Sequence, residues 1–159
     1  MVTALADAAS LHHSVESVRV ADFNIAPCCG CNACFSSVNN RCAQDDDMRL
    51  LYEKLARTDI LVLASPVYFY GVSAQLAAAV QRLHNPLRDA FHISKAALLL
   101  AAASRKPHVC ESILLQYSLL LKNFDIQDAG HVFAQGVKDL GDVMATPFLA
   151  MAANLGAGL

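Results

Sequence analysis

The chain has 159 residues, of which 55% are hydrophobic and only 16% charged, and its formal net charge is −2. A length of this order fits one domain, the lack of a basic block argues against a nucleic-acid partner, and the longest apolar run, residues 96–103, is far shorter than the roughly 20 residues that cross a bilayer. We therefore expect a single α/β domain, residues 1–159, without a nucleic-acid or membrane partner, whose sheet is covered on both faces.

The hydrophobic pattern places the elements in chain order. It predicts helices over residues 5–11, 48–55, 73–83, 111–122 and 146–155, and strands over residues 18–20, 60–64, 96–103 and 129–134. The unbroken apolar runs at 60–64 and 96–103 are typical of buried parallel strands. Asp45, Asp46 and Asp47 are placed to cap the helix that follows them.

Strands that alternate with helices indicate a parallel, doubly wound sheet. Such a sheet normally opens with its most buried strand, and the loop after that strand binds phosphate. Because this chain opens with a helical pattern, we expect the first strand to be missing.

Residues 1–18 contain no lysine or arginine, so they resemble neither a secretory signal nor a transit peptide. We expect a cytoplasmic location. In that reducing compartment the six cysteines are interpreted as thiols or metal ligands before disulfides.

Four cysteines form the motif Cys28-x2-Cys31-x2-Cys34-x7-Cys42. Two-residue gaps let consecutive thiolates turn toward one point, and a fourth thiolate beyond a polar loop completes a tetrahedral set. We predict that the four converge, with Cys29 facing away. An iron–sulfur cluster is the first interpretation, and a structural zinc site and uncoordinated thiols are the alternatives. A further cysteine, at position 110, is expected to be a small packed residue.

Three stretches together resemble the NADPH-dependent FMN reductase family. They are Ile25-Ala-Pro-Cys-Cys-Gly-Cys-Asn-Ala-Cys34-Phe35, Asp46-Asp47-Met48, and Ala64-Ser-Pro-Val-Tyr-Phe-Tyr-Gly-Val-Ser-Ala-Gln-Leu76. Within that family, the cysteine spacing resembles the branch of iron–sulfur flavoproteins. The resemblance implies a flavodoxin-like three-layer sandwich with a parallel sheet, here lacking its first strand and most of the phosphate loop.

The resemblance also implies where cofactors bind. FMN is expected at the carboxyl ends of the strands, with donor amides at Val67, Tyr68 and Phe69. The implied cofactor-binding residues are Thr3, Ser65, Pro66, Val67, Tyr68, Phe69 and Ser104, and the implied metal ligands are Cys28, Cys31, Cys34 and Cys42.

The function implied is an FMN-dependent, NAD(P)H-linked oxidoreductase or electron-transfer flavoprotein, with NADPH as donor and a small-molecule or protein electron acceptor. An aromatic, charge-free stretch, residues 67–72, suggests a homodimer or homotetramer. The alternative is a truncated, non-enzymatic dimerising or metal-binding protein without flavin.

Overall fold

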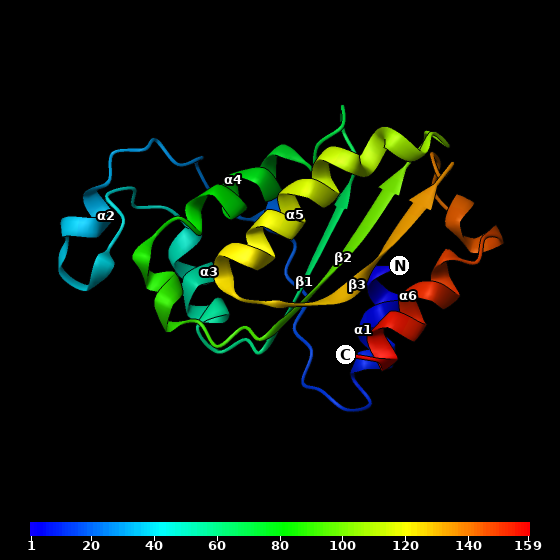
Figure 1. Ribbon diagram of the computed structural model, residues 1–159, viewed down its shortest axis with the longest axis horizontal. Helices are drawn as coiled ribbons and strands as arrows, with labels where there is room; N and C mark the ends of the chain where they lie inside the picture. The colour runs from blue at the N-terminus through cyan, green and yellow to red at the C-terminus, as the bar shows by residue number, and fades with distance from the viewer. The chain divides into compact units, whose positions relative to one another are not determined.

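The computed structural model describes the backbone of residues 1–159 and all side chains except that of Pro107. Across the described residues, one parallel sheet of three strands and six α-helices are formed (Figure 1). The elements are α1 (Val2–Ala9), α2 (Ala33–Ser36), α3 (Met48–Leu55), β1 (Ile60–Pro66), α4 (Ala74–Arg82), β2 (Lys95–Ala102), α5 (Glu111–Phe124), β3 (Gln127–Gln135) and α6 (Phe148–Ala157). Short 3₁₀ segments cover Val20–Asp22, Val38–Asn40, Pro86–Ala90, Pro107–Cys110 and Asp142–Ala145.

The chain divides into two compact units. Unit 1 comprises Met1–Ser17, Ile60–Ser73 and Ser94–Leu159, and unit 2 comprises Val18–Asp59 and Ala74–Ile93. Unit 1 therefore holds the whole sheet with α1, α5 and α6, whereas unit 2 holds the cysteine motif with α2, α3 and α4.

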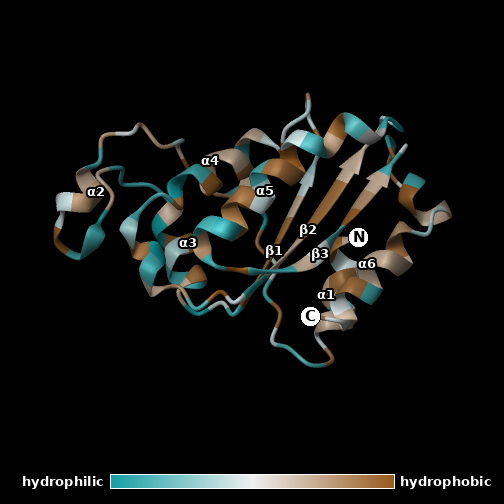
Figure 2. Cartoon of the chain, viewed as in Figure 1, coloured by the Kyte–Doolittle hydropathy of each residue, from teal (hydrophilic) through white to brown (hydrophobic). Residues whose placement is uncertain are grey.

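Unit 1 is a three-layer sandwich. Its strands run in the order β1-β2-β3, all parallel. Side chains alternate across a strand, so Leu98 and Leu100 pack with Tyr117 of α5 on one face. On the other face Leu99 packs with Leu5 of α1 and with α6. The apolar strands stand out in Figure 2. The predicted α/β fold with a parallel sheet is confirmed, and among the described residues no strand precedes β1.

Unit 2 is built around the helix that follows the three aspartates. Met48 is fully buried, and its amide donates to Asp46 Oδ1 at 3.1 Å, so the predicted capping carboxylate is Asp46. The hydroxyl of Tyr52, from the same helix, donates to the Arg82 carbonyl at 2.7 Å and ties α3 to the end of α4.

The predicted strand at residues 18–20 is wrong. Val20–Asp22 form a 3₁₀ turn, in which the Asp22 amide donates to the Arg19 carbonyl at 3.0 Å. Three alternating residues specify a strand only when a neighbouring strand pairs with them, and none does so among the described residues.

No helix in the described part of the chain has both the length and the apolar character needed to cross a membrane.

The contact between α1 and α6 gives the first testable prediction. A Cβ atom on Gly156 would overlap the carbonyl oxygen of Leu5, which is backbone and cannot rotate away. We expect Gly156→Ala to lower the free energy of unfolding by about 1–3 kcal/mol, the usual cost of overpacking, measured by urea denaturation. Gly158→Ala is the control, because its Cβ would lie 3.6 Å from the Asn154 oxygen, an ordinary contact. Equal stability of the two variants would contradict the prediction.

Candidate functional site

Parallel pairing brings the ends of the three strands of unit 1 to one edge, where the segments that follow β1 and β3 bond to the end of β2 and to its loop. The Val67 amide donates to the Ala101 carbonyl at 2.8 Å, and the Val137 amide to the Ala102 carbonyl at 3.0 Å. The Gly136 amide donates to the Ser104 carbonyl at 3.2 Å. Loops at this edge of an open parallel sheet are where ligands bind.

Ser65 fixes both ends of the first of these loops. It is buried, its hydroxyl donates to the Pro66 carbonyl at 2.8 Å, and the same oxygen accepts from the Ser73 amide at 2.8 Å. With both of these bonds made, Ser65 acts by shaping the loop.

The middle of this loop is a tight hairpin. Tyr68 and Gly71 exchange backbone hydrogen bonds of 2.8 and 3.0 Å, and the two residues between them have positive φ angles, 47° at Phe69 and 67° at Tyr70. This is the geometry of a two-residue primed turn, which normally takes asparagine and glycine. Bulky residues with left-handed angles are strained, and such strain collects at functional sites.

The hairpin displays its aromatic rings to solvent. Phe69 is 97% exposed, and the Tyr70 ring stacks on His108 with centroids 6.4 Å apart. The Ser112 hydroxyl of α5 donates to the Tyr70 carbonyl. The predicted donor role fails for two amides, because those of Val67 and Tyr68 are already bonded within the protein. The side chains of Pro66, Val67, Tyr68 and Phe69 remain predicted flavin contacts.

The second and third loops contribute a cation, Arg105. Gly136 has a φ of 70°, and a Cβ there would lie 2.9 Å from Arg105 Nε, so the guanidinium of Arg105 lies against the glycine backbone. Ser104 accepts from the Lys106 amide at 3.2 Å. The missing side chain of Gly136 leaves room for Arg105 at this edge.

Thr3 lies in the first turn of α1 and is exposed. Its predicted role toward the FMN phosphate stays a prediction.

In unit 2, the cysteine motif is carried by a loop whose two legs are bonded to each other. We call residues 24–27 the first leg and residues 42–47 the second leg. The Asn24 amide donates to Asp47 Oδ2 at 2.8 Å, the Ala26 amide to Asp46 Oδ2 at 3.1 Å, and Gln44 Nε2 to the Pro27 carbonyl at 3.2 Å.

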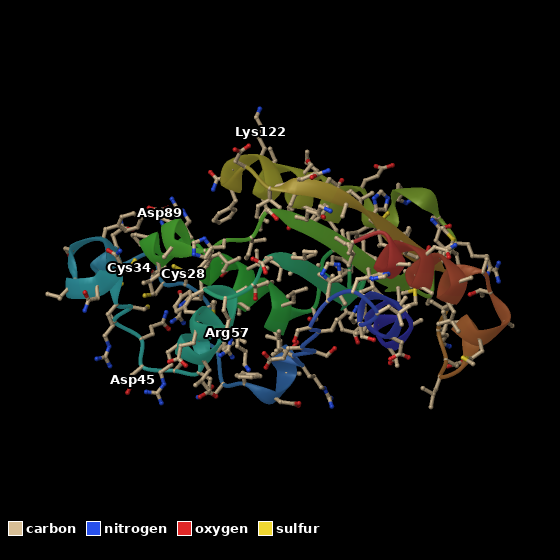
Figure 3. The ribbon with its side chains drawn as sticks, turned by 90° about the horizontal axis from the view of Figure 1, so that it is seen from below. Cys28, Cys34, Asp45, Arg57, Asp89 and Lys122 are labelled. Carbon is tan, nitrogen blue, oxygen red and sulfur yellow. The ribbon has the colours of Figure 1, made fainter. Side chains whose placement is uncertain are left out.

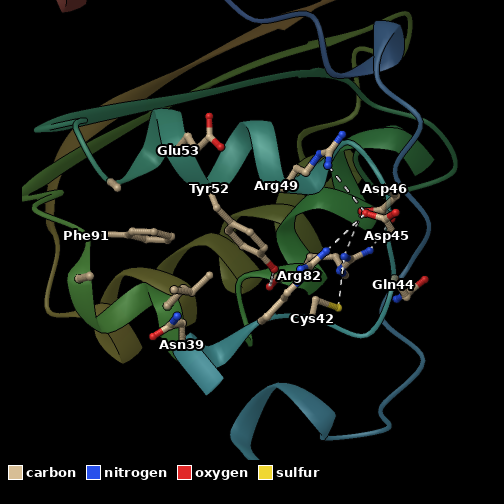
Figure 4. A pocket seen from close by; sticks show the side chains of 14 residues that line it. Asn39, Cys42, Gln44, Asp45, Asp46, Arg49, Tyr52, Glu53, Arg82 and Phe91 are labelled. Carbon is tan, nitrogen blue, oxygen red and sulfur yellow. Dashed lines mark hydrogen bonds and ion pairs between the residues drawn. The ribbon is translucent and has the colours of Figure 1, made fainter. Parts of the chain in front are cut away.

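Arg82 lies at the base of this loop and is only 3% exposed. Figure 4 shows it beside Asp46 and Cys42 in a pocket of about 550 Å³ that Tyr52 and Phe91 also line. Its Nη1 donates to Asp46 Oδ2 at 2.7 Å and its Nη2 donates to Cys42 Sγ at 3.3 Å. The contact between Arg82 and Cys42 was not foreseen from the sequence, where Arg82 is simply a charge at the end of a helix.

The electrostatics of the base follow from its burial. Burial alone would raise the pKa of the Asp46 carboxyl. Hydrogen bonds from Arg82 and from the amides of Ala26 and Met48 together lower it by more, so the pKa lies below its ordinary value. Burial raises the pKa of Tyr52, which keeps its hydroxyl a donor.

The structure does not gather the four cysteines. Cys28 and Cys31 are exposed and Cys34 and Cys42 are half-buried, and the described residues hold no group of three or more His, Cys, Asp or Glu side chains placed for a metal (Figure 3 labels Cys28 and Cys34). The predicted convergence on one point is therefore wrong in this structure. Cys42 lies half-buried at the base of the loop beside Arg82, whereas Cys28 and Cys31 are exposed to solvent.

The backbone amide of Ala33 is the main cause that lowers the pKa of Cys31, and the neighbouring Cys29 thiol lowers it as well. That Cys29 faces away stays a prediction. Gly30, with a φ of 68°, turns the chain between Cys29 and Cys31. Cys110 is buried against α5, as predicted.

In chemistry the donor set nevertheless suits an iron–sulfur cluster. Thiolates are the usual protein ligands of such clusters, and all four motif cysteines have sulfurs outside any disulfide.

The ion pair at the base predicts a pH dependence. The Asp46 carboxyl has an ordinary pKa of about 3.9 when unfolded and a lower one when folded. Its contribution to stability is therefore complete above the unfolded pKa and is lost as the pH falls through the folded pKa. We expect Asp46→Asn to lower the free energy of unfolding by about 3–5 kcal/mol at pH 7, because it leaves Arg82 buried without its carboxylate, and to flatten the loss of stability in acid.

Urea denaturation at several pH values checks this expectation. Asp45→Asn is the control, because the Asp45 carboxylate is exposed and its nearest cation, on Arg49, is 3.9 Å away. If the free energy of unfolding falls in acid by the same amount in Asp46→Asn and in the unaltered chain, the pair of Asp46 and Arg82 does not control stability in acid.

Curated relatives match part of the chain. An iron–sulfur flavoprotein of Methanocaldococcus jannaschii is 40% identical over 78 residues, which cover 49% of this chain and 39% of the relative. An iron–sulfur flavoprotein of Archaeoglobus fulgidus is 30% identical over 128 residues, which cover 77% of this chain and 54% of the relative. The chain thus matches about two fifths to one half of the length of these relatives.

A solved structure matches nearly all of the chain. It is the NAD(P)H:quinone oxidoreductase of Methanothermobacter marburgensis, with a TM-score of 0.73 and 15% identity over 98% of this chain and 85% of the other. This similarity shows a shared flavodoxin-like fold. The family model for NADPH-dependent FMN reductases matches residues 1–134, and the chain belongs to that family.

Proposed function

We propose that this chain is a flavin-dependent, NAD(P)H-linked oxidoreductase or electron-transfer module. The observation that carries the proposal is the edge of unit 1, where a strained aromatic hairpin and two further loops follow the carboxyl ends of the strands. Family membership and the open-sheet rule both favour FMN as the ligand of this edge.

The residues of the edge have separate roles in this proposal. Ser65 holds the ends of the loop together, which fixes the hairpin. The rings of Tyr68 and Phe69 provide the aromatic surface for the flavin ring, and the guanidinium of Arg105 provides positive charge for a phosphate of FMN or NADPH. When bound, FMN supplies the chemistry that links two-electron donors to one-electron acceptors.

The cysteine loop is the finer part of the proposal. The curated relatives are named iron–sulfur flavoproteins, and Cys28, Cys31, Cys34 and Cys42 would hold a cluster here. The electron partners proposed are an NAD(P)H donor and a small-molecule or protein acceptor. We also propose a cytoplasmic location and a second copy of the chain bound across the exposed aromatic stretch, residues 67–72. Light scattering of the purified chain tests this oligomer.

Flavin binding is tested by titrating the purified chain with FMN and following fluorescence quenching. We expect saturable binding that Phe69→Asn weakens about tenfold, because stacking on a ring is worth roughly 1 kcal/mol or more. Asparagine tolerates the left-handed angle of this turn, so thermal unfolding should show no loss of stability. Leu11→Asn is the control, because Leu11 is also exposed but belongs to none of the three loops of the edge.

Two results would contradict the flavin proposal. One is the absence of saturable binding, and the other is equal affinity in Phe69→Asn and the unaltered chain. The first result would favour the rival function, a non-enzymatic binding module, which is supported by the internal bonding of the Val67 and Tyr68 amides.

The cluster is tested by anaerobic reconstitution with iron and sulfide. We expect broad visible absorption and bound iron in the unaltered chain, and neither in Cys31→Ala, because three thiolates leave one iron open to solvent and oxidation. Cys110→Ala is the control, since Cys110 lies buried in unit 1. If the unaltered chain takes up no iron but binds zinc tightly, a structural zinc site replaces the cluster; if it binds neither, the cysteines are plain thiols.

A further inference from the structure

Besides the bonds between its own legs, the cysteine loop is held at its base by a side chain from α4, that of Arg82. Residues 28–41 extend between the two legs, and the short helix α2 and the Val38–Asn40 turn are their only regular elements among the described residues. This stretch contributes no buried residue to the core. Its placement therefore depends on how the legs are fixed.

Arg82 contacts both legs at once. Its Nη1 donates to the Ala26 carbonyl of the first leg at 2.9 Å and to Asp46 Oδ2 of the second leg at 2.7 Å. Its Nη2 donates to Asp46 Oδ1 at 3.1 Å and to Cys42 Sγ at 3.3 Å. Asp46 in turn accepts from the Ala26 amide, so the two legs and the guanidinium form a closed set of bonds.

The position of Arg82 along α4 is itself fixed. Its carbonyl accepts from Tyr52 of α3, and its side chain is 2% exposed, against 9% for Asp46. Arg82 Nε has no hydrogen-bond partner among the described residues. Leaving a buried donor unsatisfied is costly. Because the bonds of Nη1 and Nη2 are kept at that cost, these two nitrogens determine the orientation of the guanidinium.

Only arginine can make this set of contacts. A planar guanidinium presents its donors as a rigid fork that reaches a carboxylate, a carbonyl and a sulfur together, whereas the ammonium of lysine is a single point. The neighbouring cations do not duplicate it: Arg41 and Arg49 pair only loosely with the exposed Asp45, at 4.0 and 3.9 Å.

We propose that Arg82 is the positioning residue of the cysteine loop, which fixes Cys42 Sγ relative to the two legs and keeps a hydrogen-bond donor on that sulfur. The part that concerns a bound cluster rests on the proposed function. A donor to a ligating sulfur stabilises the more reduced cluster, so Arg82 raises its reduction potential.

The first test uses the metal-free chain and does not depend on any cofactor. Arg82→Lys keeps the charge, and Arg49→Lys is the matched control at an exposed arginine of the same pocket. Hydrogen exchange of the Ala26 and Met48 amides, which donate to Asp46, should be at least tenfold faster in Arg82→Lys and unchanged in Arg49→Lys. Equal exchange in the two variants overturns the proposal.

Circular dichroism establishes that each variant is folded. If Arg82→Lys fails to fold, the double variant Arg82→Met with Asp46→Asn takes its place, because it removes both members of the pair and leaves no unpaired buried charge. The amide followed there is that of Asn24, because it donates to Asp47 and neither substitution removes that acceptor. Faster exchange is expected, and protection equal to that of the unaltered chain would overturn the proposal.

The second test uses the reconstituted chain. We expect Arg82→Lys to bind less than half the iron of Arg49→Lys, and the cluster that does form to have a more negative midpoint potential in a spectroelectrochemical titration. A purely structural role would lower the iron content without changing the potential. That outcome would overturn the claim that the hydrogen bond from Arg82 to Cys42 raises the potential, because Arg82→Lys keeps the charge and removes this donor. If even the unaltered chain binds no iron, the cluster of the proposed function fails, and hydrogen exchange alone decides the role of Arg82.

Discussion

Parallel pairing is the constraint on which the candidate flavin edge depends. Pro66 of β1 pairs with Ala101 of β2, which pairs with Ala134 of β3, so all three strands end at the same level. Because every strand runs the same way, the segments that follow them begin side by side. Ser104 and Gly136 therefore meet although they lie far apart in the sequence, and Val67 after β1 bonds to the end of β2.

That meeting requires the loops to satisfy their own backbone groups. The hairpin does so by closing on itself, and its two central residues take left-handed angles as a consequence. The strain leaves the rings of Phe69 and Tyr70 at the tip, where an aromatic ligand can reach Phe69. It also leaves fewer amides for that ligand than the resemblance implied, so contact with the rings takes a larger part in recognition than hydrogen bonding.

Sequence reasoning succeeded where one local signal decided the structure. The apolar runs fixed β1 and β2, and the spacing of Met48, Leu51, Tyr52 and Leu55 fixed α3. It failed where the outcome depended on distant partners. Val18 and Val20 have the alternation of a strand, but no strand among the described residues pairs with them. Phe69 and Tyr70 would normally avoid positive φ angles, and the two hydrogen bonds between Tyr68 and Gly71 hold them there.

The cysteine motif was the least predictable feature. The spacing of the cysteines along the chain limits how far apart their sulfurs can lie, but it does not determine where each sulfur lies. The two-residue gaps allow Cys28, Cys31 and Cys34 to turn toward one another, but a long polar segment separates them from Cys42. Closing such a loop costs conformational entropy that its own exposed residues cannot offset. The buried bonds of Arg82 to both legs lower that cost, since they hold the ends together before any ligand arrives. Arg82, forty positions from Cys42 in the sequence, thus positions that thiol, and the spacing of the cysteines alone could not have indicated this contact.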